Sequence, residues 1–492
     1  MQLLVHTLDE LTLVIDIGKS HAKLLMVDTS GSVVEHHERD NVSVQSSLGY
    51  LALDVHGLEA WMAQTLREST NTARCSHAIA STHGAAIVAL DEEGLAWEPL
   101  DYEFDCLAQY SLMAREPEDV ADDFADTLSP DLPAGLNAAR QLLYMQYLQP
   151  GAWLRTRCLL PYPQYWTWRL CGQRASEVSS LGCHTHLWHP QEGSFSNLAK
   201  NKGWSALFAP LRSAWDVLGT VSPAIAMAWG LPKHCKVHVG AHDSNACLAR
   251  YLPTTGDQSA SSQALTVVSS GTWTVLMALG APTATLKVEH DMLANVDVLG
   301  RATPTARFMG GRDFALLLDG AAPELGSLEI IQRLVDLEIF AMPSFVVDKA
   351  LKSENTITNS LDVWVIQKGQ HLQKSLSFTL TAAERATLAA MYCALHTAWL
   401  ARKLWEGSTS VTRSVIVEGP LAQNTLYLSI LQALLPEYSC LSSTDTLEGT
   451  ARGAWLLSRW NTKANIQFLQ PVPSTEIPNL NSYGTKWLAL LS

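Results

Sequence analysis

Two aspartates of this sequence, Asp16 and Asp243, stand where an apolar run gives way to small polar residues. Phosphoryl transfer to an alcohol needs such carboxylates, because an alcohol is a poor nucleophile at neutral pH and gains from one positioned acceptor for its proton. Asp243, at the strand-to-helix edge of VHVGAHDSNA, is the candidate acceptor. Taken singly, it is better interpreted as the N-cap of its helix.

Asp16 comes just before the turn Gly18-Lys19-Ser20. A carboxylate beside a tight turn suits a metal-bound phosphate, so Asp16 is the candidate holder of Mg²⁺, directly or through water. Its simpler interpretation is a turn-capping carboxylate. The turn looks like the end of a P-loop, but Leu13 stands where that motif requires glycine, so the P-loop interpretation fails.

Two further stretches carry small polar turns. Residues 269–272, Ser-Ser-Gly-Thr, separate two strand-like runs and could offer backbone N–H groups and hydroxyls to phosphate oxygens, although a plain β-hairpin uses the same residues. Residues 415–436 are predicted as a strand, a glycine turn and a helix, and residues 447–455 as another small-residue helix start. Such an arrangement can hold a nucleotide base and ribose against backbone.

The elements around these motifs form a repeated pattern. Residues 11–38 are predicted as a β-meander, followed by a helix over 55–70 and a strand over 77–82. Strand, turn and strand begin again at 265, and the Gly, Ser and Thr-rich stretch 253–264 resembles a linker. We therefore expect an α/β protein of two related lobes, one over 1–250 and one over 251–492.

Three further elements are predicted from composition. Residues 381–407 should form a long helix of the second lobe. The aromatic-rich stretch 161–190 is expected to fill a core rather than to line a ligand pocket. The nine cysteines are scattered without a CxxC pair, which predicts reduced, mostly buried thiols.

The composition also limits the partners. A formal net charge of −14 argues against a broad basic face for nucleic acid, and no apolar run reaches the length of a membrane span. The first ten residues do not have the pattern of a secretory signal, so we expect a cytoplasmic location.

In this order and at these separations, the four motifs resemble those of the FGGY carbohydrate kinases, members of the actin, sugar kinase and Hsp70 superfamily. The resemblance covers about residues 11–460. It implies two ribonuclease H-like (actin-like ATPase) lobes with the active site in the cleft between them, and the use of ATP with Mg²⁺. The sequence does not fix the oligomeric state, and a homodimer is one option.

The resemblance also assigns roles to residues. The phosphate motif Asp-x-Gly falls on Asp16 and Gly18, with Lys19, Ser20 and Lys23 beside it, and a second phosphate motif falls on Gly271 and Thr272. The catalytic Asp falls on Asp243, with His242 in a rhamnulose kinase-like spelling. The adenosine motif falls on Gly419 and Asn424, with Pro420 where a second glycine is common. The segment RFMGGRDF, residues 307–314, receives no role.

For the sugar, His83 and Gly84 occupy the place of the family's sugar-facing turn, and Glu103 is a further candidate. With His242 they favour a ketose, either a ketopentose or a 6-deoxyketohexose such as rhamnulose, fuculose, xylulose or ribulose. Two alternatives stay open. One is a metal-dependent hydrolase built on His184, His186 and His189 with His242 and Asp243 as further ligands. The other is a kinase-like sugar sensor without catalysis.

Overall fold

The structure is a computed structural model that describes residues 10–106, 108–109, 124–252, 264–290, 292–343, 363–371, 376–409, 413–445, 449–462 and 469–491. The chain divides into two compact units. The first comprises Met1–Ser261, Leu286–Pro304 and Leu447–Asn465. The second comprises Ser262–Thr285, Thr305–Thr446 and Ile466–Ser492.

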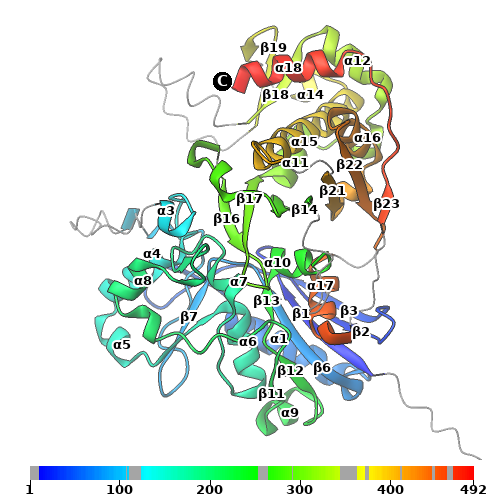
Figure 1. The fold of residues 1–492 in the computed structure, drawn as a ribbon. Coiled ribbons are helices and arrows are strands. Elements are labelled where there is room, and N and C mark those ends of the chain that lie inside the picture. Colours follow the sequence, from blue (N-terminus) through cyan, green and yellow to red (C-terminus); the bar gives the residue numbers. More distant parts are fainter. Residues whose placement is uncertain are drawn as a thin grey trace, which may run out of the picture. The chain divides into compact units, whose positions relative to one another are not determined.

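The first unit is built on one mixed sheet (Figure 1). Its strands are β1 (Leu11–Ile17), β2 (His21–Val27), β3 (Val33–Asp40), β6 (Cys75–Thr82), β11 (Val217–Thr220), β12 (Lys236–His238) and β13 (Ala241–His242). The first three form the antiparallel meander expected from the sequence, while β6 runs parallel to β1. Both β12 and β13 pair in parallel with β6, and β11 closes the edge antiparallel to β12.

Helices and small ribbons complete this unit. They are α1 (Val55–Glu68), α3 (Phe124–Thr127), α4 (Ala138–Leu148), α5 (Pro150–Arg155), α6 (Tyr162–Cys171), α7 (Val178–Leu181), α8 (Asn197–Asn201), α9 (Pro223–Trp229), α10 (Asp243–Ala249), α17 (Gly449–Leu457), β4 (Val44–Gln45), β5 (Leu51–Ala52), β7 (Ile87–Leu90), β8 (Cys158–Pro161), β9 (Trp188–His189), β10 (Ser194–Phe195) and β16 (Leu293–Val296). Tyr162, Tyr165 and Trp166 of α6 are buried in the core beneath the sheet, which confirms core filling by the start of the aromatic stretch.

The second unit repeats the strand pattern of the first. Its main strands are β14 (Ala264–Ser270), β15 (Thr274–Leu279), β17 (Ala302–Phe308), β21 (Arg413–Glu418), β22 (Tyr438–Ser443) and β23 (Leu469–Pro471). The meander β14-β15-β17 is antiparallel, and β21 and then β22 are added in parallel beside β14, as β6 and β12 are beside β1. An α/β fold with two sheet-containing lobes is thus confirmed.

Its other elements are α11 (Gly310–Leu318), α12 (Leu328–Asp336), β18 (Ile339–Met342), β19 (Trp364–Gln367), β20 (Gln370–His371), α14 (Leu376–Thr379), α15 (Ala382–Leu404), α16 (Thr425–Leu434) and α18 (Leu480–Leu491). The long predicted helix is α15, and it begins with a capping box in which Thr381 and Glu384 satisfy each other's backbone N–H groups.

All nine cysteines are buried and none forms a disulfide, as predicted. Across the described ranges, the structure contains no helix with the length and apolarity that a membrane span requires. Of the predicted linker 253–264, residues 253–263 lie outside the described residues, and Ala264 begins β14.

Candidate active site

In the first unit, the predicted site residues gather where parallel strands end. Because β1, β6 and β13 run in the same direction, their carboxyl ends meet at one edge of the sheet. Ile17 is the register partner of Thr82, which in turn is the partner of His242. The backbone N–H of His83 donates to the Ile17 carbonyl at 2.8 Å. The sheet therefore brings Asp16, His83 and His242 to the same edge.

Asp16 is 6% exposed and lies opposite Lys23 on β2 and Ser81 on β6. The turn after it is closed by a hydrogen bond of 2.9 Å from Gly18 N to the His21 carbonyl. The Asn41 side chain donates to the Gly18 carbonyl at 2.7 Å and fixes the turn from β3's end. The first phosphate motif is thus a rigid hairpin with a buried carboxylate at its base.

Asp243 is the first residue of α10, and its side chain is 27% exposed. One oxygen, Oδ1, accepts from Ser244 N at 2.5 Å and from Ser244 Oγ at 3.2 Å, and lies 3.1 Å from His242 Nε2. Within the described part of the chain, no hydrogen bond reaches the other oxygen, Oδ2. The carboxylate is therefore held by one oxygen and can offer the other to a ligand.

His242 is itself fixed by Asn245, a residue that the sequence reasoning did not single out. The Asn245 side-chain amide lies 3.0 Å from His242 Nδ1 and can donate to it, which leaves the proton on Nε2, where it faces Asp243. Burial lowers the pKa of His242, although the Asp243 charge acts in the opposite direction. A neutral His242 therefore positions Asp243 as a hydrogen-bond donor.

His83 is 5% exposed, and its ring lies between Tyr102 and Tyr162 at centroid distances of 5.4 and 5.2 Å. Its Nδ1 lies 2.9 Å from the Gly84 carbonyl and must carry a proton to donate there. Its Nε2 is buried and has no hydrogen-bond partner among the described residues. Burial lowers the pKa of His83, so Nε2 is an unprotonated acceptor near neutral pH. Gly84 adjoins His242, because an added Cβ would lie 2.9 Å from His242 Nε2.

Lys19 is committed to acidic partners in this structure. Its ammonium forms an ion pair with Asp101 and lies 3.3 Å from the Glu103 carboxylate. The Ser43 hydroxyl donates a second hydrogen bond to Asp101. Burial would raise the pKa of Asp101, but the hydrogen bonds from Lys19 and Ser43 outweigh it and hold that pKa below its usual value. Asp101, 1% exposed, was missed from the sequence, although it lies only two residues before the candidate Glu103.

In the second unit, the predicted phosphate turn lies between β14 and β15, with Gly271 and Thr272 exposed. The segment RFMGGRDF packs against it. An added Cβ at Gly311 would lie 2.1 Å from the Gly271 carbonyl oxygen and 3.3 Å from Thr272 Cα, and one at Gly310 would lie 2.1 Å from Thr274 Oγ1. The two glycines at the start of α11 therefore let this helix support the turn from behind.

The predicted adenosine segment is joined to the same turn. Gly419 has φ of +77° and its missing Cβ would lie 2.1 Å from the Ser270 carbonyl oxygen, so no other residue fits there without displacement. Ser270 Oγ donates to the Glu418 carbonyl and accepts from Leu421 N at 3.0 Å. Pro420 begins a 3-10 turn, and Asn424 caps α16 by accepting from Tyr427 N at 2.9 Å.

The segment 447–455, which the sequence grouped with the adenosine motif, belongs to the first unit. There α17 packs on α10 so closely that an added Cβ at Gly453 would lie 1.7 Å from the Ala246 carbonyl oxygen. In this structure the segment supports the helix that begins at Asp243.

The histidines of the hydrolase alternative make separate contacts. His184 Nδ1 lies 2.9 Å from the Leu136 carbonyl, His186 Nε2 lies 3.1 Å from the Ser129 carbonyl, and His189 Nε2 lies 3.5 Å from Asp126. Among the described residues, no group of three or more His, Cys, Asp or Glu side chains could hold a metal ion. The hydrolase alternative therefore gains no support.

Proteins of known structure match this chain over almost its whole length. A carbohydrate kinase from Novosphingobium aromaticivorans, of known structure, is 30% identical, with a TM-score of 0.78 and 98% of both chains covered. A xylulose kinase from Rhodospirillum rubrum superimposes with a TM-score of 0.68 at 16% identity over 98% of both chains.

Matches in sequence cover parts of the chain. The xylulose kinase of Bacillus subtilis is 24% identical over 249 residues, which is 47% of each protein, so the match spans about half the length of this curated relative. Residues 262–466 match the family described as Carbohydrate kinase FGGY, C-terminal domain.

Two ribonuclease H-like units with polar motifs at their strand ends define the actin-like ATPase class, which confirms the fold expected from the sequence. Within that class, the chain belongs to the FGGY carbohydrate kinase family.

Proposed function

We propose that this chain transfers the γ-phosphate of ATP to a hydroxyl of a ketose, with Asp243 as the general base. The observation that carries the proposal is the arrangement at Asp243. His242 and Ser244 hold Oδ1, while Oδ2 is left available to a sugar hydroxyl. Family membership supports the same reaction class, a phosphotransferase acting on a sugar hydroxyl.

In the proposed reaction, the sugar hydroxyl oxygen forms a bond to the γ-phosphorus as the bond from that phosphorus to the ADP oxygen breaks. The hydroxyl proton passes to Asp243 Oδ2. Such a base contributes about 10²- to 10⁴-fold to a rate. His242 keeps the carboxylate oriented through Oδ1, and it stays neutral because burial disfavours the charged imidazolium and lowers its pKa.

ATP and Mg²⁺ fit the remaining residues. Gly271 and Thr272 form an exposed turn of the kind that receives phosphate oxygens, and Gly419, Pro420 and Asn424 stand beside it for the adenosine. Asp16 is a single buried carboxylate, which is how Mg²⁺ is commonly held in phosphate sites, with waters and phosphates as its other ligands. When bound, the ion would neutralise charge on the phosphates. Gly18, Ser20 and Lys23 shape the hairpin around Asp16.

His83 favours a hydroxyl-rich substrate. A buried acceptor without a partner costs about 1–3 kcal/mol, and a sugar hydroxyl donating to His83 Nε2 would remove that cost. Gly84 lets the His242 ring lie beside it, because a Cβ there would be only 2.9 Å from His242 Nε2. Glu103 is a further candidate for sugar contact, and its carboxylate lies 3.3 Å from the Lys19 ammonium. Relatives named xylulose kinases favour xylulose among the ketopentoses and 6-deoxyketohexoses proposed from the sequence.

The test is an ADP-release assay with xylulose, ribulose, rhamnulose, fuculose, xylose and glycerol. We expect a ketose to lead, and His83→Ala to lower kcat/KM for it about 10- to 100-fold, as for a lost hydrogen bond in a polar site. His36→Ala, at a half-exposed position on β3, is the control. If glycerol or xylose gives the highest kcat/KM, the ketose assignment is wrong. If no sugar raises the rate of ADP release above that of ATP hydrolysis without sugar, the kinase proposal fails.

A further inference from the structure

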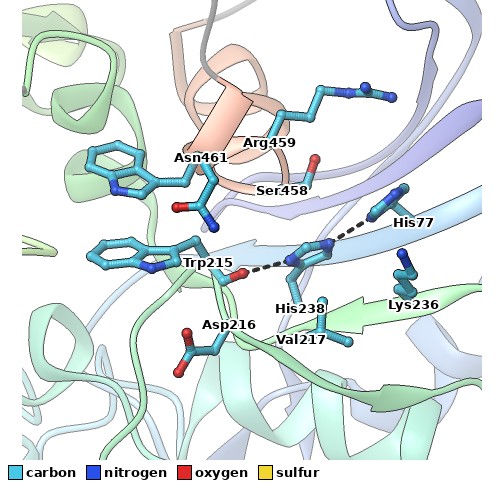
Figure 2. A pocket seen from close by; sticks show the side chains of 10 residues that line it. His77, Trp215, Asp216, Val217, Lys236, His238, Ser458, Arg459 and Asn461 are labelled. Atoms are coloured by element: carbon cyan, nitrogen blue, oxygen red, sulfur yellow. Dashed lines mark hydrogen bonds between the residues drawn. The ribbon is translucent and has the colours of Figure 1, made fainter. Parts of the chain in front are cut away.

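The first unit contains a pocket that the catalytic proposal does not use. Its volume is about 450 Å³, within the range of small-molecule sites. Figure 2 shows that β6, β11, β12 and the segment after α17 contribute its walls. It is lined by His77, Trp215, Asp216, Val217, Lys236, His238, Ser458, Arg459, Trp460 and Asn461.

Two histidines form a relay along one wall. His238 Nδ1 lies 2.8 Å from the Trp215 carbonyl and must donate to it, so its Nε2 is an acceptor (Figure 2). His77 Nδ1 lies 2.8 Å from that Nε2 and therefore carries the proton between the two rings. His77 Nε2 is left as an acceptor without a partner among the described residues. The relay thus leaves one ring nitrogen of the lining, His77 Nε2, as an acceptor.

Two cationic side chains, Lys236 and Arg459, line the same pocket. Lys236 is exposed, and its positive charge and that of Arg459 act on both histidines. Burial, reinforced by His238 and these cations, lowers the pKa of His77 to about 4, so its ring is neutral at pH 7. The carboxylate in the wall, Asp216, is paired with Arg212 at 3.0 Å.

Acidic groups also act on Arg459, because the charges of Glu10 and Asp28 partly oppose the effect of burial on its pKa. Replacing Lys236 is therefore a simpler test of the pocket's positive charge than replacing Arg459, which also interacts with these acidic groups. On the other wall, the Trp215 and Trp460 rings stack 4.8 Å apart at 11° between planes, with Trp460 1% exposed. This stack is a rigid apolar surface beside the charged groups.

We propose that this pocket binds a small molecule carrying a phosphate monoester, with the phosphate near Lys236, Arg459 and His77 and the organic part against Trp215. The chemistry is specific. With a second pKa of about 6, a phosphate near neutral pH exists partly as a monoanion that still has one O–H to donate. That hydroxyl matches the acceptor His77 Nε2, while the other oxygens accept from the cations. Sulfate carries no proton at this pH and cannot satisfy His77.

The pocket is separate from the catalytic edge. His77 and His83 lie six residues apart on and just after β6, which corresponds to about 20 Å along an extended strand. A sugar bound at His83 and Asp243 could not reach Lys236. The proposal therefore does not depend on the proposed function, and it adds a second ligand site to the first unit.

The test is isothermal titration at pH 7 with fructose 6-phosphate, fructose, inorganic phosphate and inorganic sulfate. We expect fructose 6-phosphate and phosphate to bind the wild type, and sulfate and fructose to bind at least tenfold more weakly. Lys236→Gln should weaken fructose 6-phosphate at least tenfold, and His77→Phe should remove the preference for phosphate over sulfate. Lys233→Gln, exposed on the same segment but outside the pocket lining, is the matched control.

Three outcomes would overturn the proposal. They are no binding of fructose 6-phosphate to the wild type, equal binding to the Lys236→Gln and Lys233→Gln variants, or equal affinity for sulfate and phosphate. Phosphorylated ligand held at the catalytic edge instead would give the second outcome. Thermal unfolding of each variant without ligand shows whether the fold is retained.

Discussion

The contact between α11 and the phosphate turn predicts a large catalytic effect from one methyl group. Gly311→Ala would place a Cβ 2.1 Å from the Gly271 carbonyl oxygen, whereas such atoms do not approach closer than 3.0 Å. The turn and the helix must therefore separate by about 0.9 Å or more. Misplacement of this size can cost about 10²-fold in rate. We expect kcat/KM for ATP to fall by about that factor.

The effect of Gly311→Ala on stability should be much smaller. Overpacking costs about 1–3 kcal/mol, but alanine is better than glycine within a helix by about 1 kcal/mol, so the two terms partly cancel. Gly484→Ala is the matched control, because it also lies in a helix of the second unit and its Cβ would meet Leu395 at an ordinary 3.5 Å. Steady-state kinetics and thermal unfolding are measured together. A Gly311→Ala enzyme with kcat/KM within threefold of wild type would refute the role of this turn in holding phosphates.

Two further predictions concern the metal and the core. Asp16→Asn should raise the Mg²⁺ concentration for half-maximal rate and lower the rate, whereas Asp40→Asn, exposed at the end of β3, should change neither; an unchanged Mg²⁺ titration for Asp16→Asn would count against the assignment. Burial against Phe308 lowers the pKa of His396 to about 3, so below pH 6.5 the unfolded chain binds a proton that the folded chain does not, and stability is lost as the pH falls from 6.5 towards 3. Urea unfolding gives the free energy of unfolding at pH 7.5 and at pH 5. Between these pH values it should fall by about 2 kcal/mol more in the wild type than in His396→Leu, and equal falls would show that His396 does not titrate this way.

Much of the fold was predictable, because strand order follows from local patterns. The meander of residues 11–38 and its repeat from 265 have alternating or continuous apolar runs separated by short turns, and both formed as expected. The return of residues 286–304 and 447–465 to the first unit was not predictable, since no composition change marks them. Long-range packing, such as Gly453 on Ala246, decides that return.

At the candidate site, the sequence predicted the residues at strand ends but missed the residues that support them. Asn245 and Asp101 act through His242 and Lys19, and nothing in their local spacing indicates such partners. Gly310 and Gly311 were visible as a pair without a role, because the reason for a glycine is the neighbour that approaches it. That neighbour, the Gly271 turn, is distant in sequence.

The central claim is that Asp243 accepts the proton of the sugar hydroxyl, and Asp243→Asn tests it most directly. The measurement is rapid-quench phosphorylation of xylulose in a single turnover, together with the dissociation constants for ATP and xylulose. The account predicts a fall in the rate of phosphoryl transfer of about 10²-fold or more, with both dissociation constants within a few-fold of wild type, since the amide keeps the shape of the carboxylate but cannot take the proton. A variant that phosphorylates xylulose within tenfold of the wild-type rate would contradict it.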